Sequence, residues 1–185
     1  CFMPLCYGGS IKTIEDIRTL FQLGIEKVVI NDILFDDPET VRKSVELFGS
    51  QSIVASVDVK KNLWGVYKIY RHSTKKTVNL SPVEYIKKLE ELGVGEILLY
   101  SVDRDGTWEG MDNDLINEVT HKTHLPVISC GGVGKLEDVE DGILNGSSGV
   151  AIGSMCVYSK KDMGVLIKFP KQNDIEQIIK NYENL

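Results

Sequence analysis

The sequence has few features of membrane, secreted or metal-binding proteins. It contains no apolar run near the roughly 18 residues of a membrane-spanning helix, and no signal-peptide pattern. Its four cysteines lack the CxxC spacing of zinc sites, and those in apolar runs (Cys6, Cys130 and Cys156) are expected to be reduced and buried. We therefore expect a cytoplasmic protein without a metal or other cofactor.

The chain also lacks an excess of positive charge, since 27 acidic residues outnumber 21 Lys and Arg and the net charge is −6. An acidic protein is poorly suited to nucleic acid or to an anionic membrane, because both repel it. A phosphorylated small molecule remains compatible with this charge, because a single pocket can be locally positive. We expect no nucleic-acid and no membrane partner.

The remaining composition is that of one globular domain spanning residues 1–185, with 42% hydrophobic and 26% charged residues. The first residue is Cys, so we expect the chain to begin inside a longer protein. Short β-branched apolar runs alternate with amphipathic segments, which predicts a parallel sheet covered by helices, in a barrel or a doubly wound sheet. The expected strands are 3–7, 27–31, 52–58, 96–101, 126–130 and 149–153; the expected helices are 13–23, 38–48, 81–92, 112–120 and 135–144.

Two segments interrupt this alternation. Residues 63–77 alternate aromatic and polar side chains around a glycine, which predicts a β-hairpin directly after a strand. The tail, residues 164–185, contains a short apolar strand (VLIKF), a proline and a final helix.

An internal repeat predicts the number of strands. Residues 4–16 (PLCYGGSIKTIED) resemble residues 126–138 (PVISCGGVGKLED), and 24–31 resemble 146–153; position 126 against 4 is an offset of 122 residues. This offset spans four β/α units, so it predicts a half-barrel duplicated into a (β/α)₈ TIM barrel. The chain would then contain strands three to eight, with the first two β/α units missing.

In such barrels the active site lies at the carboxyl ends of the strands. The repeat places two glycine-containing turns there, where backbone N–H groups can approach a phosphate. One predicted cradle combines Gly131 and Gly132 with Gly153 and Ser154. The repeat copies it to a second one, which combines Gly8, Gly9 and Ser10 with Asn31 and Asp32. We call the barrel opening at the carboxyl ends of the strands the mouth. Two cradles on opposite sides of this mouth would suit an elongated ligand with a phosphate at each end. The alternative is that each is a plain strand-to-helix turn.

Carboxylates follow two of the strands. Asp58 ends one strand and, shielded by the hairpin, would serve as a general acid or base; the alternative is a solvated loop aspartate. Asp105 and Gly106 follow another strand in the motif DRDGT and would orient ligand hydroxyls, or would form only an Asp-Gly turn. His72, in the hairpin, is expected to be exposed and away from the chemistry.

Residues 48–60, 95–112 and 125–138 resemble HisF, the cyclase family of imidazole glycerol phosphate synthase. The resemblance implies a TIM barrel with Asp58 as a catalytic acid in ring closure, and a HisH-like glutaminase partner that supplies ammonia. A second catalytic aspartate would end strand one, outside residues 1–185. The implied ligand-binding residues are Gly9, Ser10, Asn31, Asp105, Gly106, Gly131, Gly132, Gly153 and Ser154, and the implied ammonia gate is Lys27 with Glu96.

The chain departs from the family pattern at Ser10, which replaces a glycine, and at Asp32, where a carboxylate would repel a phosphate. The motifs CYGGS, SVDVKKN and VLIKFP resemble a HisF-like branch linked to acetamidino modification of cell-surface sugars, as in lipopolysaccharide biosynthesis. Three hypotheses follow: the histidine-pathway cyclase, the sugar-modifying paralogue, and an inactive barrel fragment.

Overall fold

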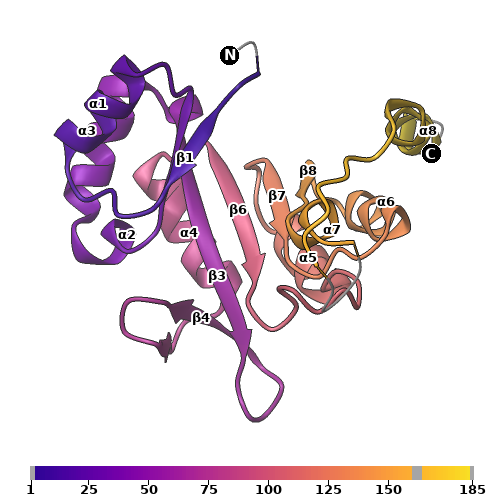
Figure 1. Cartoon of the computed structure of the whole chain (residues 1–185). Coiled ribbons are helices and arrows are strands. Elements are labelled where there is room, and N and C mark those ends of the chain that lie inside the picture. The colour runs from indigo at the N-terminus through magenta and orange to yellow at the C-terminus, as the bar shows by residue number, and fades with distance from the viewer. Residues whose placement is uncertain (1–2, 160–163, 184–185) are drawn as a thin grey trace.

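A curled parallel sheet runs through the computed structural model, which describes residues 3–159 and 164–183 (Figure 1). Its strand order is β1-β2-β3-β6-β7-β8, and every neighbouring pair on this path is parallel. The α/β architecture predicted from the alternating pattern is therefore confirmed as a curled half-barrel, consistent with a TIM barrel. The strands are β1 (Cys6–Gly8), β2 (Lys27–Ile30), β3 (Ile53–Lys61), β6 (Glu96–Ser101), β7 (Val127–Cys130) and β8 (Gly149–Ala151).

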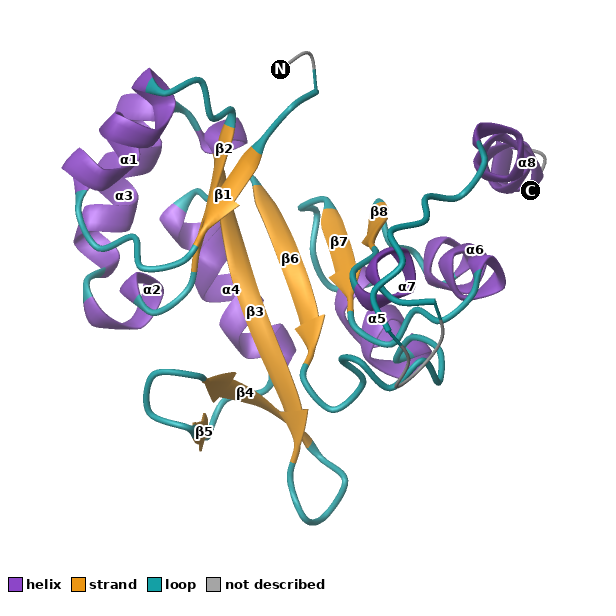
Figure 2. Cartoon of the chain, in the orientation of Figure 1, coloured by secondary structure: helices purple, strands orange, loops and turns teal. Residues whose placement is uncertain are grey.

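The helices cover one face of this sheet (Figure 2). The five predicted ones are α1 (Ile14–Gln22), α3 (Pro38–Phe48), α4 (Pro82–Leu92), α5 (Asn113–Thr120) and α6 (Leu136–Leu144). Local sequence sets their ends: α4 begins with a capping box between Ser81 and Glu84 and ends at Gly93, which adopts a left-handed conformation. Short helices that the apolar periodicity did not predict are α2 (Ile33–Asp36), η1 (Ser50–Ser52) and α7 (Ser154–Val157).

The core lies between the sheet and these helices. Along β3, Ile53, Ala55 and Val57 point to the helices and are fully buried, whereas Ser56 faces the opposite, concave side and is half-buried. The helical side of the core includes Leu89 of α4, which is also fully buried. Within the described residues, no helix has the length and apolarity needed to cross a membrane.

The predicted hairpin is present and extends the sheet at one edge of the mouth. Strand β3 continues three residues beyond Asp58, then pairs antiparallel with β4 (Tyr67–Arg71), which pairs with β5 (Lys76–Val78). Its base is held to the barrel because the Tyr67 hydroxyl donates to buried Asp112 at 2.5 Å. The hairpin therefore projects over the carboxyl ends of the strands from a fixed base.

The internal repeat is visible in the backbone. Helices α1 and α6 begin at residues 14 and 136 and end at 22 and 144, so both ends keep the offset of 122. In each helix, the aspartate at the third residue accepts hydrogen bonds from two backbone N–H groups. Asp16 accepts from residues 12 and 13, and Asp138 accepts from residues 134 and 135. Whether two further β/α units precede the chain stays a prediction.

Two sequence-based expectations are wrong. The tail segment VLIKF is not a strand, since only Val165 forms an isolated bridge, to Tyr158. Cys6 is exposed at the sheet edge, whereas Cys130 is half-buried and Cys156 buried. The predicted final helix is present as α8 (Gln172–Glu183), and residues 184 and 185 lie outside the described residues.

Candidate active site

A cavity of about 830 Å³ opens on the concave face of the sheet, at the carboxyl ends of the strands. It unites one predicted cradle with the predicted acid, because its lining includes Gly9, Ser10, Asn31 and Asp58. It also contains side chains that sequence reasoning did not assign to the site: Ser56, His72, Tyr100 and Cys130.

Strand register explains why these additional residues lie together. Asp58 is the pairing neighbour of Tyr100, and Tyr100 is the neighbour of Cys130, across β3, β6 and β7. Side chains at paired positions of parallel strands point to the same face. Ser56 lies two residues before Asp58 and faces the same way. The period-two pattern contained this signal, but it became usable only once the strand order and register were known.

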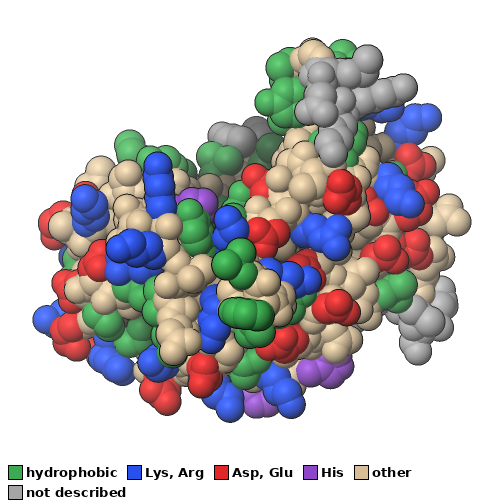
Figure 3. Space-filling view, turned by 90° about the horizontal axis from the view of Figure 1, so that it is seen from below, with side chains coloured by type: hydrophobic (Ala, Val, Ile, Leu, Met, Phe, Trp, Pro, Cys, Tyr) green, Lys and Arg blue, Asp and Glu red, His purple; other side chains and the backbone are tan. Residues whose placement is uncertain are grey.

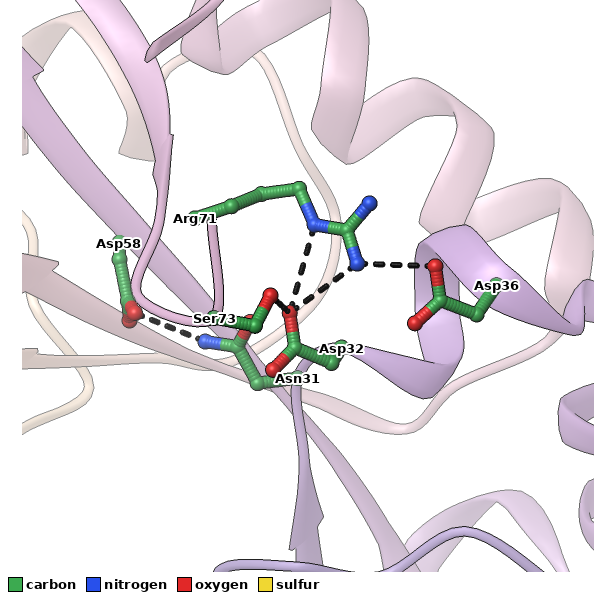
Figure 4. Close-up of polar contacts among 6 residues, drawn as sticks. All are labelled: Asn31, Asp32, Asp36, Asp58, Arg71 and Ser73. Atoms are coloured by element: carbon green, nitrogen blue, oxygen red, sulfur yellow. Dashed lines mark hydrogen bonds and ion pairs between the residues drawn. The ribbon is translucent and has the colours of Figure 1, made fainter. Parts of the chain in front are cut away.

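Asp58 is the most deeply placed carboxylate of the cavity, with 5% of its surface exposed. One carboxylate oxygen accepts from the Ser56 hydroxyl at 2.9 Å, and the other accepts from the Asn31 amide at 2.8 Å (Figure 4). Burial raises the pKa of the Asp58 carboxyl above its ordinary value, and these two hydrogen bonds with the charge of His72 offset part of the rise. A carboxyl group whose pKa is raised keeps its proton to higher pH, which is the direction that a general acid requires.

The expectation that His72 lies away from the chemistry is wrong. The hairpin folds its imidazole back over the mouth, where Nε2 lies 3.5 Å from Asp58 Oδ2. The ring is 58% exposed, as predicted, and packs edge-on against Tyr70 at 4.9 Å between ring centroids. His72 therefore joins the buried carboxylate to the solvent side of the cavity.

Replacing His72 by Gln is expected to raise the pKa of Asp58 further, because the positive charge that favours its ionised form is removed. The pH at which Asp58 is half-protonated would move upward. The ¹³C resonance of the Asp58 side-chain carboxyl, followed in a pH titration of both proteins, measures this change. An absent shift would show that the contact has no electrostatic effect, and a downward shift would show that His72 does not favour the ionised form of Asp58.

The carboxylate of Asp32, which raised doubt about the phosphate cradle beside it, is held by basic and hydroxyl donors. Arg71 of the hairpin donates to Asp32 Oδ1 from Nε at 3.3 Å and from Nη2 at 3.2 Å, and Ser73 donates to the same oxygen at 2.6 Å (Figure 4). Arg71 Nη2 also donates to Asp36 at 2.8 Å. Arg71 and Ser73 thus neutralise part of the negative charge at this end of the cavity.

The second predicted cradle does not line the cavity. Gly131 and Gly132 are buried at the end of β7 with φ of 105° and 100°, and the Gly110 N–H donates to the Gly132 carbonyl at 3.0 Å. On the neighbouring strand end, Gly153 is exposed and Ser154 begins α7. Both cradles lie at the carboxyl ends of the strands, one after β1 and β2 and the other after β7 and β8, with β3 and β6 between them.

Asp105 and Gly106 form an exposed turn after β6. Their closest tie to the site is through Tyr100: burial, followed by the neighbouring Asp105 carboxylate, raises the pKa of the Tyr100 phenol. Asp105 therefore lies beside Tyr100, which lines the cavity, but does not line it itself.

Lys27 and Glu96 lie at the opposite, amino-terminal ends of β2 and β6. Their side chains form an ion pair at 2.5 Å inside the curl of the sheet, with Glu96 only 18% exposed.

The molecular surface at the opposite end, over the carboxyl ends of the strands, has basic and acidic side chains intermixed (Figure 3). Such a mixed surface has no broad field of one sign, so any preference for an anion must come from the cavity itself.

Comparison with known proteins places the chain among enzymes of histidine biosynthesis. The family described as "Histidine biosynthesis protein" matches residues 1–162. A protein of Pseudomonas aeruginosa that provisionally carries the name imidazole glycerol phosphate synthase subunit hisF2 is 43% identical over 95% of the chain and 70% of its own length. Imidazole glycerol phosphate synthase subunit HisF of Chlorobium limicola is 41% identical over 86% of the chain and 63% of its own length. The HisF subunit of Dehalococcoides mccartyi is 37% identical over 97% of the chain and 71% of its own length. The chain therefore spans about two thirds of these relatives.

Proposed function

Because this chain belongs to the HisF family of histidine biosynthesis proteins, we propose that it is part of an ammonia-using synthase subunit, a cyclase-lyase of the imidazole glycerol phosphate synthase type. The observation that carries the proposal is the buried Asp58 of β3, with a raised pKa, in a cavity shared with Gly9 and Asn31. A protonated carboxyl at that point can donate to an acceptor held in the mouth.

In this proposal the substrate is a bis-phosphorylated aminoimidazole ribonucleotide intermediate, which reacts with ammonia to give imidazole glycerol phosphate and an aminoimidazole carboxamide ribotide. Asp58 is the acid in ring closure. Gly131, Gly132, Gly153 and Ser154 hold one phosphate, and Asp105 with Gly106 contacts the part of the ligand between the ends. These roles rest on the position of each residue at the carboxyl edge of the sheet.

Ammonia would enter from the opposite end of the barrel. The Lys27–Glu96 pair lies there inside the curl of the sheet, as expected of a gate that a charged pair can open or close. A HisH-like glutaminase docked on this end would supply ammonia from glutamine. The proposed partner therefore contacts the face farthest from Asp58, and substrate and ammonia approach from opposite ends.

The test is turnover of the full-length protein. With the bis-phosphorylated substrate, we expect product formation that depends on ammonium salt and rises with pH as free ammonia replaces ammonium, measured by absorbance or by chromatography of the two products. Addition of the glutaminase should let glutamine replace ammonium. Product formed at equal rate without any ammonia source would contradict the proposal.

A second candidate is the sugar-modifying paralogue, in which ammonia delivery is kept and the acceptor differs. The specific observation in its favour is Asp32, a carboxylate held by Arg71 at the predicted cradle of Gly9 and Ser10. The two candidates separate in the cell. Complementation of a histidine auxotroph by the complete gene supports the first, whereas failure of complementation by a stably expressed protein supports the second.

A further inference from the structure

The repeat makes the two ends of the mouth directly comparable, and their backbones match. Gly9 and its mate Gly131 have φ of 117° and 105°, and Ser10 and its mate Gly132 have φ of 58° and 100°. Under the same offset of 122 residues, the mate of Asp32 is Ser154. The two predicted anion positions therefore share a frame but differ in charge, since one has a carboxylate where the other has a hydroxyl.

Arg71 is fixed in the position from which it holds Asp32. Its guanidinium lies 4.7 Å from the centre of the Phe35 ring, and Phe35 stacks on buried Tyr85 at 4.8 Å. Only 18% of the Arg71 side chain is exposed. Arginine and a hydroxyl are the donors that a ligand phosphate would need. Here both donate to Asp32 Oδ1, so the protein's own carboxylate takes the place of an external anion.

The charges around this end oppose a second anion. Besides Asp32, the acidic and basic residues that line the cavity are Lys12, Asp36, Asp37, Asp58 and His72. With Arg71 included, four carboxyl groups stand against two permanent cations, so the local balance of charge is negative. A phosphate dianion would meet this charge and would also have to displace Asp32 from its hydrogen bonds, which leaves a half-buried carboxylate without its donors.

The other oxygen of Asp32 is available to a different kind of ligand group. Arg71 Nε, Arg71 Nη2 and the Ser73 hydroxyl all donate to Oδ1 of Asp32. No donor within residues 3–159 and 164–183 forms a hydrogen bond with Oδ2. Asp32 lines the cavity and its side chain is 43% exposed. A carboxylate oxygen in this state accepts hydrogen bonds from hydroxyl or amino groups. This end of the mouth is therefore suited to a neutral, hydroxyl-bearing group.

We propose that Asp32, Arg71 and Ser73 form a specificity device that closes one end of the mouth to phosphate, so that the acceptor has an anionic group at one end only and hydroxyls at the other. This inference takes one element from the proposed function, namely that an elongated phosphorylated acceptor occupies the mouth. It keeps the ammonia-using chemistry of the proposed function and narrows the acceptor to one that carries phosphate at a single end, in place of the bis-phosphorylated substrate.

Inorganic phosphate is the probe that tests this device, with backbone amide resonances of the full-length protein as the readout. In the wild-type protein, millimolar phosphate is expected to leave the Gly9 and Ser10 amides unmoved. In Asp32→Asn, which keeps the side-chain size but frees Arg71, phosphate should shift both amides and bind there about tenfold or more tightly than to wild type. Adding Arg71→Gln to Asp32→Asn should abolish the gain.

Asp114→Asn, an exposed change on α5 with the same effect on net charge, is the matched control and should gain nothing. Asp32→Ser, which copies the mate Ser154, gives a second variant if Asp32→Asn folds poorly. Phosphate shifts at Gly9 and Ser10 in the wild-type protein, or no gain in either Asp32 variant, would overturn the device. The same titration judges the proposed phosphate cradle separately: unmoved Gly132 and Ser154 amides in every protein would count against that cradle alone.

Discussion

Replacing Asp58 by Asn is expected to lower turnover of the full-length protein by about 10²–10⁴-fold, the usual contribution of a general acid. Asparagine keeps the shape of the side chain and can still accept from Asn31 or Ser56 through its one remaining oxygen. The loss would therefore fall on the chemical step, with ligand binding nearly unchanged. Single-turnover kinetics and a separate measurement of ligand affinity distinguish the two effects.

Asp114→Asn serves as the matched control here as well, because it makes the same chemical change on an exposed helical surface. It should retain wild-type turnover. Asp58→Asn with wild-type turnover would refute the assigned role, and a parallel loss of ligand affinity would assign Asp58 to binding. Circular dichroism of both variants guards against a loss that arises from misfolding.

Replacing Gly132 by Ala is expected to produce the largest loss of folding stability among small changes at the mouth. A Cβ at this position would lie 2.2 Å from the Gly110 carbonyl oxygen, on a backbone with φ of +100°. The unfavourable φ costs about 1–3 kcal/mol, and forcing the Gly110 loop away costs about 1–3 kcal/mol more. Urea denaturation of the variant and of the wild-type protein measures the difference in free energy of unfolding.

Gly9→Ala is a control that the repeat supplies. Gly9 has an equally unfavourable φ of +117°, but a Cβ there would meet no atom within 4 Å. It should lose only the backbone contribution, so Gly132→Ala should be the less stable of the two by about 1–3 kcal/mol. Equal losses would mean that the Gly110 loop moves freely, and that the buried cradle is not held by this contact.

Much of the fold could be predicted because its signals are local. The helices α1, α3, α4, α5 and α6 follow apolar periodicity and capping residues, both of which act within a few positions. The repeat was equally readable. Its offset of 122 residues pairs Gly9 with Gly131 and Ser10 with Gly132, and all four have positive φ in the structure. The prediction of a strand at VLIKF was wrong because an apolar run forms a strand only where a neighbouring strand can pair with it, and here Val165 makes one isolated bridge.

The composition of the cavity was predicted less completely. Asp58, Gly9 and Asn31 could be placed near one another because a barrel gathers the carboxyl ends of its strands, and all three line the cavity; their roles stay predictions. His72 was missed because its place depends on how the hairpin folds back over the mouth, and the same holds for the bond between Arg71 and Asp32. Asp32 by itself implied repulsion of a phosphate, whereas its contacts identify the groups that hold it.

The sequence by itself determined most of the strands and helices, the internal repeat, and the carboxyl strand ends as the place where a site is expected. These depend on neighbouring residues and on a general rule of the fold. Only the tertiary structure decided which side chains meet. Arg71 and Asp32 are 39 positions apart, and sheet register together with the hairpin brings them together. No local sequence pattern encodes the contact between these two side chains, since it depends on the packing of several elements at once.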